Sequence, residues 1–534
     1  MAKNERLRSW AAVILIGGLS GLAAAFAMAL VMFVLRWALG VPTPAELLGD
    51  RMAPTFSPNQ FLALLQQYGG YNQLKQIGVG SVLGGQTVVA ILGGLTLALI
   101  ERGRKNKTPA GPSVTRTGKI FVAGFVGLLW VGTLIALWPV LSTSFIGLPP
   151  ASAAIATTVG ALVSYSTYGI VLVAIMALIV ALIVGRPVPA EPEIPGQTVI
   201  KRRMFLAAGA TAALAAAAGA ALTRLYYLAA FSYDGTQYIG AEVRPITPND
   251  RFYTVTKNVV DPEVLKPVWR LQVTGMVERS RDYAFEDLKS LPGIDQETTL
   301  MCISNWVGGG LMSNAIWKGV PLRSLIEAAG PKQGIYKVFF RAVDGYTDSI
   351  LYEKAMNPTT MVAYEMNGEP LPAHHGYPVR IIVPGMFGEK NVKWVTRIEL
   401  VDYDRKGFYE TQGWGPTFVV PTRARFDFPY YDQTVPFASS ITLKGVGFGG
   451  DQGVSRVEVS IDGGSSWVDT RLDYPGTKLS WALWSYDWHP AVPGDYKLVV
   501  RATDGTGAVQ TAKERGTAPD GATGYHRVTL RLSA

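Results

Sequence analysis

The first 225 residues contain five long apolar stretches, and these restrict how the chain can fold. Each approaches or exceeds the roughly 20 apolar residues that a helix needs to cross a bilayer. The stretches cover residues 10–35, 79–100, 120–141, 160–184 and 204–222. The fifth is mostly alanine, so a buried helix of a soluble domain is the alternative for it. We therefore predict an α-helical membrane domain with five transmembrane helices over residues 1–225.

The distribution of charge predicts how this domain is oriented. The 534-residue chain has a formal net charge of +9, and residues 1–225 carry 17 Lys and Arg against six Asp and Glu. Cytoplasmic loops are enriched in positive charge. Here the charge gathers on the N-terminal tail and after the second and fourth stretches, so we expect a cytoplasmic N-terminus and an extracytoplasmic remainder. The rest of the chain lacks the clustered basic charge of a nucleic-acid footprint, so no nucleic-acid partner is predicted.

A pair of arginines opens the fifth stretch. Arg202 and Arg203 precede Met204, Phe205 and Leu206. This run resembles a twin-arginine export signal, with an ordinary basic anchor as the alternative. Because it stands directly before the expected extracytoplasmic part, we interpret it as an export signal that stays as an anchor. The twin-arginine pathway carries folded proteins, which implies a cofactor inserted in the cytoplasm.

Beyond the membrane domain the sequence changes to short β-rich runs. We expect a linker over 226–245 and a mixed α+β domain over 246–426, with a helix over 322–329 closed by Gly330. From 427 to 534 strand-like runs alternate with Gly and Asp turns, which indicates an all-β immunoglobulin-like sandwich. The predicted fold class is thus an α-helical membrane domain, an α+β domain and an all-β sandwich.

Cys302 is the single cysteine of the chain. No intrachain disulfide and no Cys-rich iron–sulfur site can therefore form. A lone cysteine is most often a small buried hydrophobic residue, but this one follows a strand-like run and precedes a Gly-rich turn, where it could be a thiolate ligand of a soft metal. All four histidines lie beyond residue 225, so we expect no haem in the membrane domain. Electrons must then come from an external partner.

Three short runs in the α+β domain carry a family resemblance. Residues 363–372 read AYEMNGEPLP, residues 375–380 read HGYPVR and residues 388–394 read GEKNVKW. In this order and spacing they closely resemble the molybdopterin-binding domain of the sulfite oxidase family. Residues 427–534 resemble the C-terminal dimerisation domain of the same family. The resemblance covers about 245–534 and implies a sulfite-oxidase-type oxidoreductase with a mononuclear molybdenum held by molybdopterin.

The resemblance also implies roles for individual residues. Cys302 aligns with the molybdenum ligand and Tyr364 with the active-site tyrosine, while Lys257 and Trp317 would line the pocket. A phosphate dianion binds well to a guanidinium fork, an ammonium and backbone N–H groups. The positions that would hold the pterin and its phosphate are Tyr253, Thr254, Asn258, Asp344, His375, Arg380, Lys390, Asn391, Val392 and Lys393.

Two departures from the family bear on the substrate. Sulfite oxidases usually follow the cysteine with Gly-Asn-Arg-Arg, whereas residues 303–306 read Ile-Ser-Asn-Trp. They also carry an arginine before a downstream tryptophan, whereas Ile316 precedes Trp317. The loss of two cations disfavours a sulfite dianion and favours a neutral oxo compound such as a sulfoxide. Sulfite oxidase or dehydrogenase activity is the first alternative, and a non-catalytic membrane docking subunit with the same fold is the second.

The interpretation as a whole is a membrane-anchored enzyme that catalyses oxygen-atom transfer. Its expected partners are a small oxo-donor or oxo-acceptor substrate, membrane lipid, and an external electron carrier such as a cytochrome or a quinone-linked subunit. The resemblance to a dimerisation domain adds the expectation of a homodimer.

Overall fold

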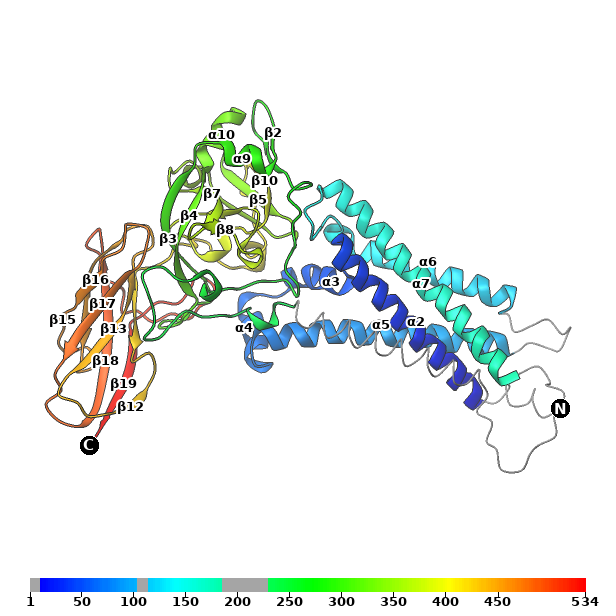
Figure 1. Cartoon of the computed structure of the whole chain (residues 1–534), viewed down its shortest axis with the longest axis horizontal. Coiled ribbons are helices and arrows are strands. Elements are labelled where there is room, and N and C mark those ends of the chain that lie inside the picture. The colour runs from blue at the N-terminus through cyan, green and yellow to red at the C-terminus, as the bar shows by residue number, and fades with distance from the viewer. Residues whose placement is uncertain (1–9, 103–113, 185–228) are drawn as a thin grey trace. The chain divides into compact units, whose positions relative to one another are not determined.

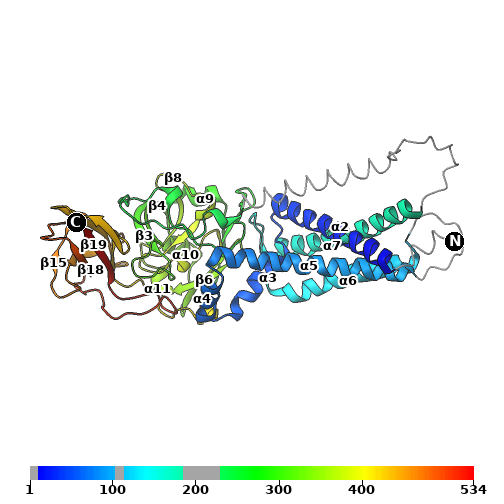
Figure 2. The same cartoon turned by 90° about the horizontal axis from the view of Figure 1, so that it is seen from below.

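The computed structural model of the chain describes residues 10–102, 114–184 and 229–534, and it divides into two compact units. The first unit holds most of the apolar helices. The second holds Tyr233–Ala534 together with two short segments from the N-terminal half, Met52–Asn72 and Ile146–Pro149. The segment Met52–Asn72, drawn in blue, belongs with green and yellow elements that are distant in the sequence (Figures 1 and 2).

The first unit consists of long helices that pack side by side (Figure 1). They are rich in Leu, Ile, Val, Ala and Gly, so nearly every face is apolar, which is typical of helices surrounded by lipid or protein. The helices are α2 (Trp10–Leu39), α3 (Pro44–Met52), α5 (Tyr71–Arg102), α6 (Arg116–Leu137) and α7 (Pro150–Val184), with the 3₁₀ turn η2 (Trp138–Val140) after α6.

Four of the five predicted spans coincide with these helices. Within the described residues, four helices are long and apolar enough to cross a membrane: Val13–Leu39, Tyr71–Arg102, Arg116–Val140 and Pro150–Ala181. The fifth predicted span, 204–222, lies outside the described residues, and so do Arg202 and Arg203.

Small residues bring the helices of the first unit close together. A Cβ atom added at Gly21 on α2 would lie 2.7 Å from the carbonyl oxygen of Ala90 on α5, so the two backbones are in contact. Close approach through glycine and alanine is a common way for membrane helices to associate. Tyr168 of α7 adds a hydrogen bond from its hydroxyl to the same Ala90 carbonyl, at 2.8 Å.

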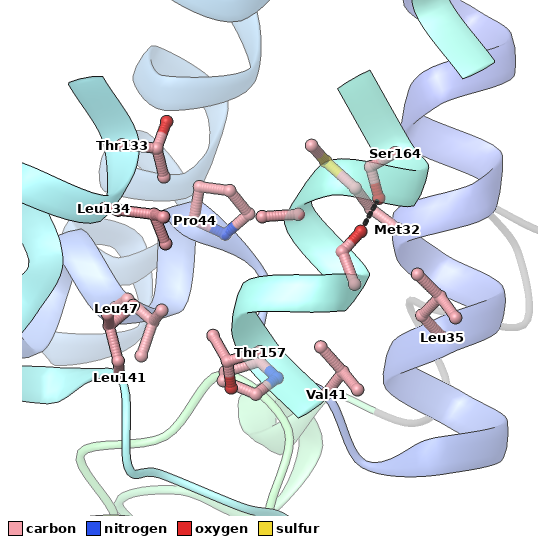
Figure 3. Close-up of a pocket in the computed structure, with 13 residues that line it drawn as sticks. Met32, Leu35, Val41, Pro44, Leu47, Thr133, Leu134, Leu141, Thr157 and Ser164 are labelled. Atoms are coloured by element: carbon pink, nitrogen blue, oxygen red, sulfur yellow. Dashed lines mark hydrogen bonds between the residues drawn. The ribbon is translucent and has the colours of Figure 1, made fainter. Parts of the chain in front are cut away.

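A small cavity of about 20 Å³ lies in the first unit, lined by residues of α2, α3, α6, α7 and the loops beside them (Figure 3). Its walls are mostly aliphatic, with Thr133, Thr157 and Ser164 as the polar residues. Ser164 donates its hydroxyl to the Gly160 carbonyl at 2.8 Å. This space holds about one water molecule, so it is too small to bind a substrate.

The short helix α4 (Pro58–Gln67) follows the 3₁₀ turn η1 (Ala53–Thr55) and belongs to the second unit. Ser57 forms a capping box with Gln60: its hydroxyl accepts from the Gln60 backbone N–H, while the Gln60 side chain accepts from the Ser57 backbone N–H. Pro58 at the first helical position reinforces this start, because its missing N–H would have no partner there. Asn72, just beyond the helix, donates to the Asp234 carbonyl at 2.9 Å.

The α+β domain of the second unit contains one mixed sheet and one antiparallel sheet. One has the strand order β2-β1-β10-β5-β6, in which only β1 and β10 are parallel. The other has the order β3-β4-β7-β8, with β9 also paired to β7. The strands are β1 (Leu271–Gly275), β2 (Arg281–Tyr283), β3 (Ile294–Met301), β4 (Met312–Pro321), β5 (Lys337–Ala342), β6 (Thr347–Leu351), β7 (Met361–Met366), β8 (Glu369–Pro370), β9 (Arg380–Ile382) and β10 (Val395–Val401).

Short helices connect these strands. The helix predicted at 322–329 is α10 (Leu322–Ala329), and Gly330 ends it in the left-handed conformation at φ +70°. A residue with a Cβ is strained at that φ, which is why glycine closes the helix. The other helical segments after residue 229 are α9 (Phe285–Ser290), α11 (Tyr352–Ala355), η3 (Ala230–Ser232), η4 (Asn249–Arg251), η5 (Ala373–His375), η6 (Gly388–Lys390) and η7 (Glu410–Gln412).

The C-terminal part is a sandwich of two sheets, which confirms the predicted all-β class (orange and red in Figure 1). The sheets have the orders β11-β13-β17-β16 and β12-β19-β18-β14-β15. The turn 462–464 lies between β14 and β15, which pair in antiparallel fashion. The strands are β11 (Arg423–Phe428), β12 (Gln433–Pro436), β13 (Ile441–Phe448), β14 (Val454–Ser460), β15 (Val468–Asp469), β16 (Arg471–Tyr474), β17 (Ala482–Trp488), β18 (Gly494–Asp504) and β19 (His526–Ser533).

Two boundaries differ slightly from the expected ones. The first strand of the sandwich, β11, begins at Arg423 rather than at 427. Residues expected to be a linker contribute to the second unit, because Tyr238 is 1% exposed and packs on Trp481.

We predict that Gly21→Ala lowers the thermal midpoint of unfolding of the detergent-solubilised protein. The added methyl would clash with the α5 backbone, and such overpacking typically costs about 1–3 kcal/mol. Gly18→Ala on the same helix is the matched control, since nothing lies within 4 Å of its Cβ position. Thermal scans by circular dichroism compare the two, and equal midpoints would contradict close packing of α2 on α5.

Candidate functional site

A cavity of about 760 Å³ lies in the second unit. Ten of the residues singled out in the sequence line it. They are Tyr253, Thr254, Lys257, Cys302, Asp344, His375, Arg380, Asn391, Val392 and Lys393. The fold therefore brings one thiol and several cationic side chains, from segments far apart in the sequence, to one space.

Cys302 stands in the turn that joins β3 to β4. The ladder of this hairpin ends at the pair Met301 and Met312, and the backbone N–H of Cys302 donates to the Leu311 carbonyl at 3.0 Å. The Asn305 side chain accepts from the Leu311 N–H at 3.0 Å, which closes the turn. The sulfur lies 3.1 Å from the hydroxyl of Ser304, within hydrogen-bond distance. Burial raises the pKa of the Cys302 thiol to about 11, so a metal must displace its proton on binding.

Two buried arginines of the sandwich strand β11 support this turn. Arg425 donates to the carbonyls of Gly309 and Tyr238, each at 2.8 Å. Arg423 donates to the Asn305 carbonyl at 3.4 Å and to the Ala522 carbonyl at 2.6 Å. Hydrogen bonds from a charged donor are stronger than neutral ones, so the sandwich holds the cysteine-bearing turn in place.

The cationic wall of the cavity is built around Arg380. Its Nη1 donates to the His375 carbonyl at 3.1 Å and its Nη2 to the Asn391 carbonyl at 3.0 Å. Its Nε is buried and has no hydrogen-bond partner among the described residues. Lys393 pairs with Arg380 in a β-bridge and donates its Nζ to the His374 carbonyl at 3.0 Å. Burial lowers the pKa of Arg380 to about 10 and also lowers that of Lys393, which marks both as desolvated cations.

A third cation, Lys257, lines the cavity from another segment. Its Nζ donates to the Asp344 carbonyl at 3.0 Å and lies 3.8 Å from the Asp344 carboxylate. Asn258 donates to the same carboxylate at 2.9 Å. Asn258 therefore supports the cavity wall without lining it.

The structure places three more predicted residues outside the cavity lining. Trp317 lies behind Arg380, with the guanidinium 5.0 Å from its ring centroid. Lys390 is fully buried and forms an ion pair with Asp348 at 2.6 Å. Tyr364 packs in the hydrophobic core with Val362 and Val379. Trp317 thus contacts a residue of the cavity lining, and Lys390 pairs with a buried carboxylate. Tyr364 lies in the core, on the opposite face of β7 from Ala363.

Several lining residues were not singled out in the sequence. Tyr346 and Tyr409 carried no signal, and Glu389 lies inside the run GEKNVKW but was given no role. Burial raises the pKa of Tyr253 and Tyr409 above the usual value for a phenol, so both stay protonated at neutral pH, and both line the cavity that contains Cys302. Burial also raises the pKa of Glu389 to about 8, and its Oε1 has no partner among the described residues. The cavity thus contains protonated donors beside the sulfur.

Part of the remaining wall is apolar. This part is formed by α4 and by two tryptophans, and the sequence offered no indication of it because α4 lies between two of the long apolar helices. The residues of this wall are Phe61, Leu62, Leu65, Trp306 and Trp414.

The residues present fit a molybdopterin cofactor. An anionic group would satisfy the Arg380 Nε, which is buried without a partner in the described residues and close to Lys393. Within the described residues no group of three or more His, Cys, Asp and Glu side chains could hold a metal ion. Cys302 would thus be a single thiolate ligand, with further sulfur donors supplied by the cofactor itself.

The comparisons with known proteins agree with this chemistry. Residues 257–409 match the oxidoreductase molybdopterin binding domain family. Residues 423–532 match the Mo-co oxidoreductase dimerisation domain family. The two matches place the fold and the cavity in the class of molybdopterin-dependent oxidoreductases.

Individual relatives show which family of molybdopterin-dependent oxidoreductases the chain belongs to. The chain is 32% identical over 315 residues to sulfite oxidase of Gallus gallus, covering 50% of this chain and 68% of that protein. It is 28% identical over 350 residues to sulfite oxidase of Arabidopsis thaliana, covering 54% and 88% of the two. It is 29% identical over 332 residues to the NADH nitrate reductase of Solanum lycopersicum, covering 50% and 36%. The chain belongs to the sulfite oxidase family.

A solved structure supports the same fold. The sulfane dehydrogenase SoxCD from Paracoccus pantotrophus superimposes with a TM-score of 0.50 and 25% sequence identity, covering 55% of this chain and 85% of that one. The two family matches begin at residue 257, so the N-terminal helices of this chain lie outside them.

We predict that Arg380→Ala reduces molybdopterin in the purified protein by about tenfold or more. A charged hydrogen bond contributes about 1.5–3 kcal/mol, and the guanidinium is the most buried cation of the cavity wall. Pterin fluorescence after acid release and molybdenum by mass spectrometry measure the content. Arg323→Ala, on the exposed face of α10, is the matched control. Wild-type protein without pterin, from a host that makes the cofactor, would favour the non-catalytic alternative.

Proposed function

We propose that the protein is a membrane-anchored, extracytoplasmic molybdenum–molybdopterin enzyme that transfers an oxygen atom from a small uncharged substrate of the sulfoxide class. The supporting observation is the lining of the cavity beside Cys302. Among the lining residues that the structure describes, Arg380 is the only arginine. Trp306 lines the cavity at a position where sulfite oxidases carry an arginine, and Ile316 is partly exposed on β4 outside the lining. An uncharged substrate suits this wall better than a dianion.

In this proposal, different residues of the chain have different roles. Cys302 would hold the metal, and His375, Arg380 and Lys393 would hold the pterin and its phosphate. When bound, the cofactor supplies oxygen-atom transfer coupled to two electrons. The protonated phenols of Tyr253 and Tyr409 can donate hydrogen bonds to a substrate oxygen. Apolar neighbours exclude water, which strengthens such hydrogen bonds.

Reduction of a sulfoxide consumes two electrons and two protons and releases a thioether and water. Glu389 is suited to supply a proton, because its carboxyl group is in the cavity wall and stays protonated near neutral pH. The electrons come from an external carrier, such as a cytochrome or a quinone-linked subunit. The four apolar helices support membrane anchoring, and the charge distribution of the sequence supports a cytoplasmic N-terminus. The sandwich supports a homodimer through its match to a dimerisation domain.

Oxidation of sulfite is the second candidate function. It is favoured by the names of two relatives, the sulfite oxidases of Gallus gallus and Arabidopsis thaliana. The cations of the cavity, Lys257 among them, would have to bind the sulfite dianion in place of the missing arginines.

A substrate screen separates these candidates. With reduced viologen as donor, we expect the purified enzyme to reduce dimethyl sulfoxide and methyl phenyl sulfoxide, and Cys302→Ala to lose the activity. With ferricyanide as acceptor, we expect no turnover of sulfite. Viologen oxidation and ferricyanide reduction are followed by absorbance. Turnover of sulfite without any sulfoxide reduction would establish the second candidate instead.

The role of Glu389 predicts a pH dependence. Burial favours the neutral acid, so the proton is present below about pH 8 and lost above it. We expect kcat for sulfoxide reduction to fall as pH rises through about 8, and Glu389→Gln to lower kcat by about 100-fold and remove this limb. The groups whose charges act on Glu389 are Asp348, Lys390 and Glu410, so their ion pairs must be intact in the variant, which a thermal scan checks. An unchanged limb in Glu389→Gln would assign the proton to another residue.

A further inference from the structure

The helix α4 forms part of the cavity wall although it lies between the first two apolar helices in the sequence. Phe61, Leu62, Leu65 and Gln66 of this helix line the cavity, and we call the three apolar residues Phe61, Leu62 and Leu65 the α4 wall. They lie at spacings of one, three and four residues, which places them on one face of the helix. Gly70 and Tyr71, which follow the helix, also line the cavity.

Several contacts hold α4 in position. The Phe61 ring meets the Tyr71 ring edge-on at 5.7 Å between centroids. Asn72 donates to the Asp234 carbonyl, and Asp234 in turn lines the cavity and accepts from the Thr256 N–H at 2.9 Å. Phe61 also packs against the hydrophobic cluster that contains Trp414 and Phe418. The α4 wall is therefore a built part of the second unit.

The α4 wall and the cationic wall are associated with different hydrophobic clusters. Phe61 packs with the cluster of Trp414, whereas Cys302 packs with the cluster of Phe252 and Trp317, over which Arg380 lies. A pterin phosphate requires the cationic wall. The α4 wall offers nothing to an anion, so it is available to another group.

Trp414 adds one polar group, its indole N–H, to this apolar region. Its indole Nε1 is buried and has no hydrogen-bond partner among the described residues. Such an unpaired donor is costly unless a ligand supplies an acceptor. Trp306, also in the lining, is 54% exposed and so stands where the cavity meets solvent.

We propose that the α4 wall, with Trp306 and Trp414, forms a subsite that selects substrates carrying an alkyl or aryl group, and that Trp414 Nε1 donates a hydrogen bond to the acceptor oxygen of such a substrate. This proposal rests on the proposed function, and it makes a loop between two membrane helices a determinant of specificity. The preferred substrates are then sulfoxides with a large apolar substituent rather than small oxyanions.

The test compares two substrates that differ in one substituent. Wild-type enzyme should have a KM for methyl phenyl sulfoxide at least about tenfold below that for dimethyl sulfoxide, because apolar contacts of this size discriminate by such factors. Leu65→Ala should raise the KM for methyl phenyl sulfoxide by about tenfold while changing the KM for dimethyl sulfoxide by less than about twofold. Leu65→Phe, which fills the subsite, should also weaken the aryl substrate selectively.

The control is Leu64→Ala, which removes the same side chain from the same helix at a position outside the cavity lining. It should leave both KM values unchanged. If Leu64→Ala and Leu65→Ala behave alike, or if wild-type enzyme does not distinguish the two sulfoxides, the α4 subsite is overturned while sulfoxide reduction itself stands.

Binding of thioethers separates this proposal from the proposed function, because it requires no turnover. By titration calorimetry, methyl phenyl sulfide should bind wild-type enzyme, and Leu65→Ala should weaken that binding by about tenfold. Equal binding to both proteins, or no binding to either, would overturn the subsite even if sulfoxides are reduced. Conversely, selective thioether binding without turnover of any sulfoxide would support the subsite and contradict the proposed reaction.

A final variant tests the hydrogen bond. Trp414→Phe keeps an aromatic ring but removes the donor, so it should raise the KM for methyl phenyl sulfoxide by about fivefold to tenfold. The thioether has no acceptor oxygen, so its dissociation constant should change by less than about twofold. Equal effects on both ligands would show that Trp414 acts through packing alone and would overturn its role as donor.

Discussion

The hydrogen bonds from Arg423 and Arg425 to the turn around Cys302 are the contacts on which the site depends. A cysteine on an open turn would not hold a metal at a defined place, because a ten-residue connection between two strands can adopt many conformations. Here two charged donors from the sandwich bind carbonyls at both ends of the turn, at Asn305 and Gly309. His526 of β19 also fills the space next to Gly308, which has φ +88° and could not carry a Cβ there. The C-terminal sandwich is therefore part of the active-site architecture, whatever its part in dimer formation.

The cationic wall of the cavity contains buried positive charge that is hydrogen-bonded to backbone carbonyls. Arg380 donates to two backbone carbonyls, Lys393 donates to another, and neither forms an ion pair with a carboxylate among the residues that the structure describes. Burial of cations without carboxylate partners destabilises a folded protein. A bound phosphate offsets this cost, so cofactor binding and stability of the folded domain are coupled. The buried ion pair of Lys390 and Asp348 differs, because each charge already has its partner. This distinction explains why Lys390, although inside the family motif, does not line the cavity.

Much of the fold could be predicted from local sequence signals. The helix at 322–329 and its terminal Gly330 follow from a short apolar repeat and a residue that tolerates positive φ. The cavity residues of the motif were also placed together, since His375, Arg380 and Lys393 lie on adjacent short segments. Tyr364 illustrates what a motif does not reveal. Side chains alternate along a strand, and on β7 Ala363 faces the cavity side while Tyr364 faces the core of the other sheet. Tyr409 and Glu389 could not be found in this way, because burial in three dimensions, not sequence pattern, makes them protonated donors.

The contribution of α4 shows why sequence could not reveal the whole site. The residues that we propose to bind the cofactor lie within about 253–393, and nearly all of them fall inside the part of the chain that matches the molybdopterin-binding domain family. The α4 wall comes from a segment more than 180 residues earlier in the sequence, in a part of the chain that the family matches do not cover. Tyr71 lines the cavity and is also the first residue of α5. Because the α4 wall supplies no ligand to the cationic wall, its residues can change the substrate that enters without changing how the cofactor is held.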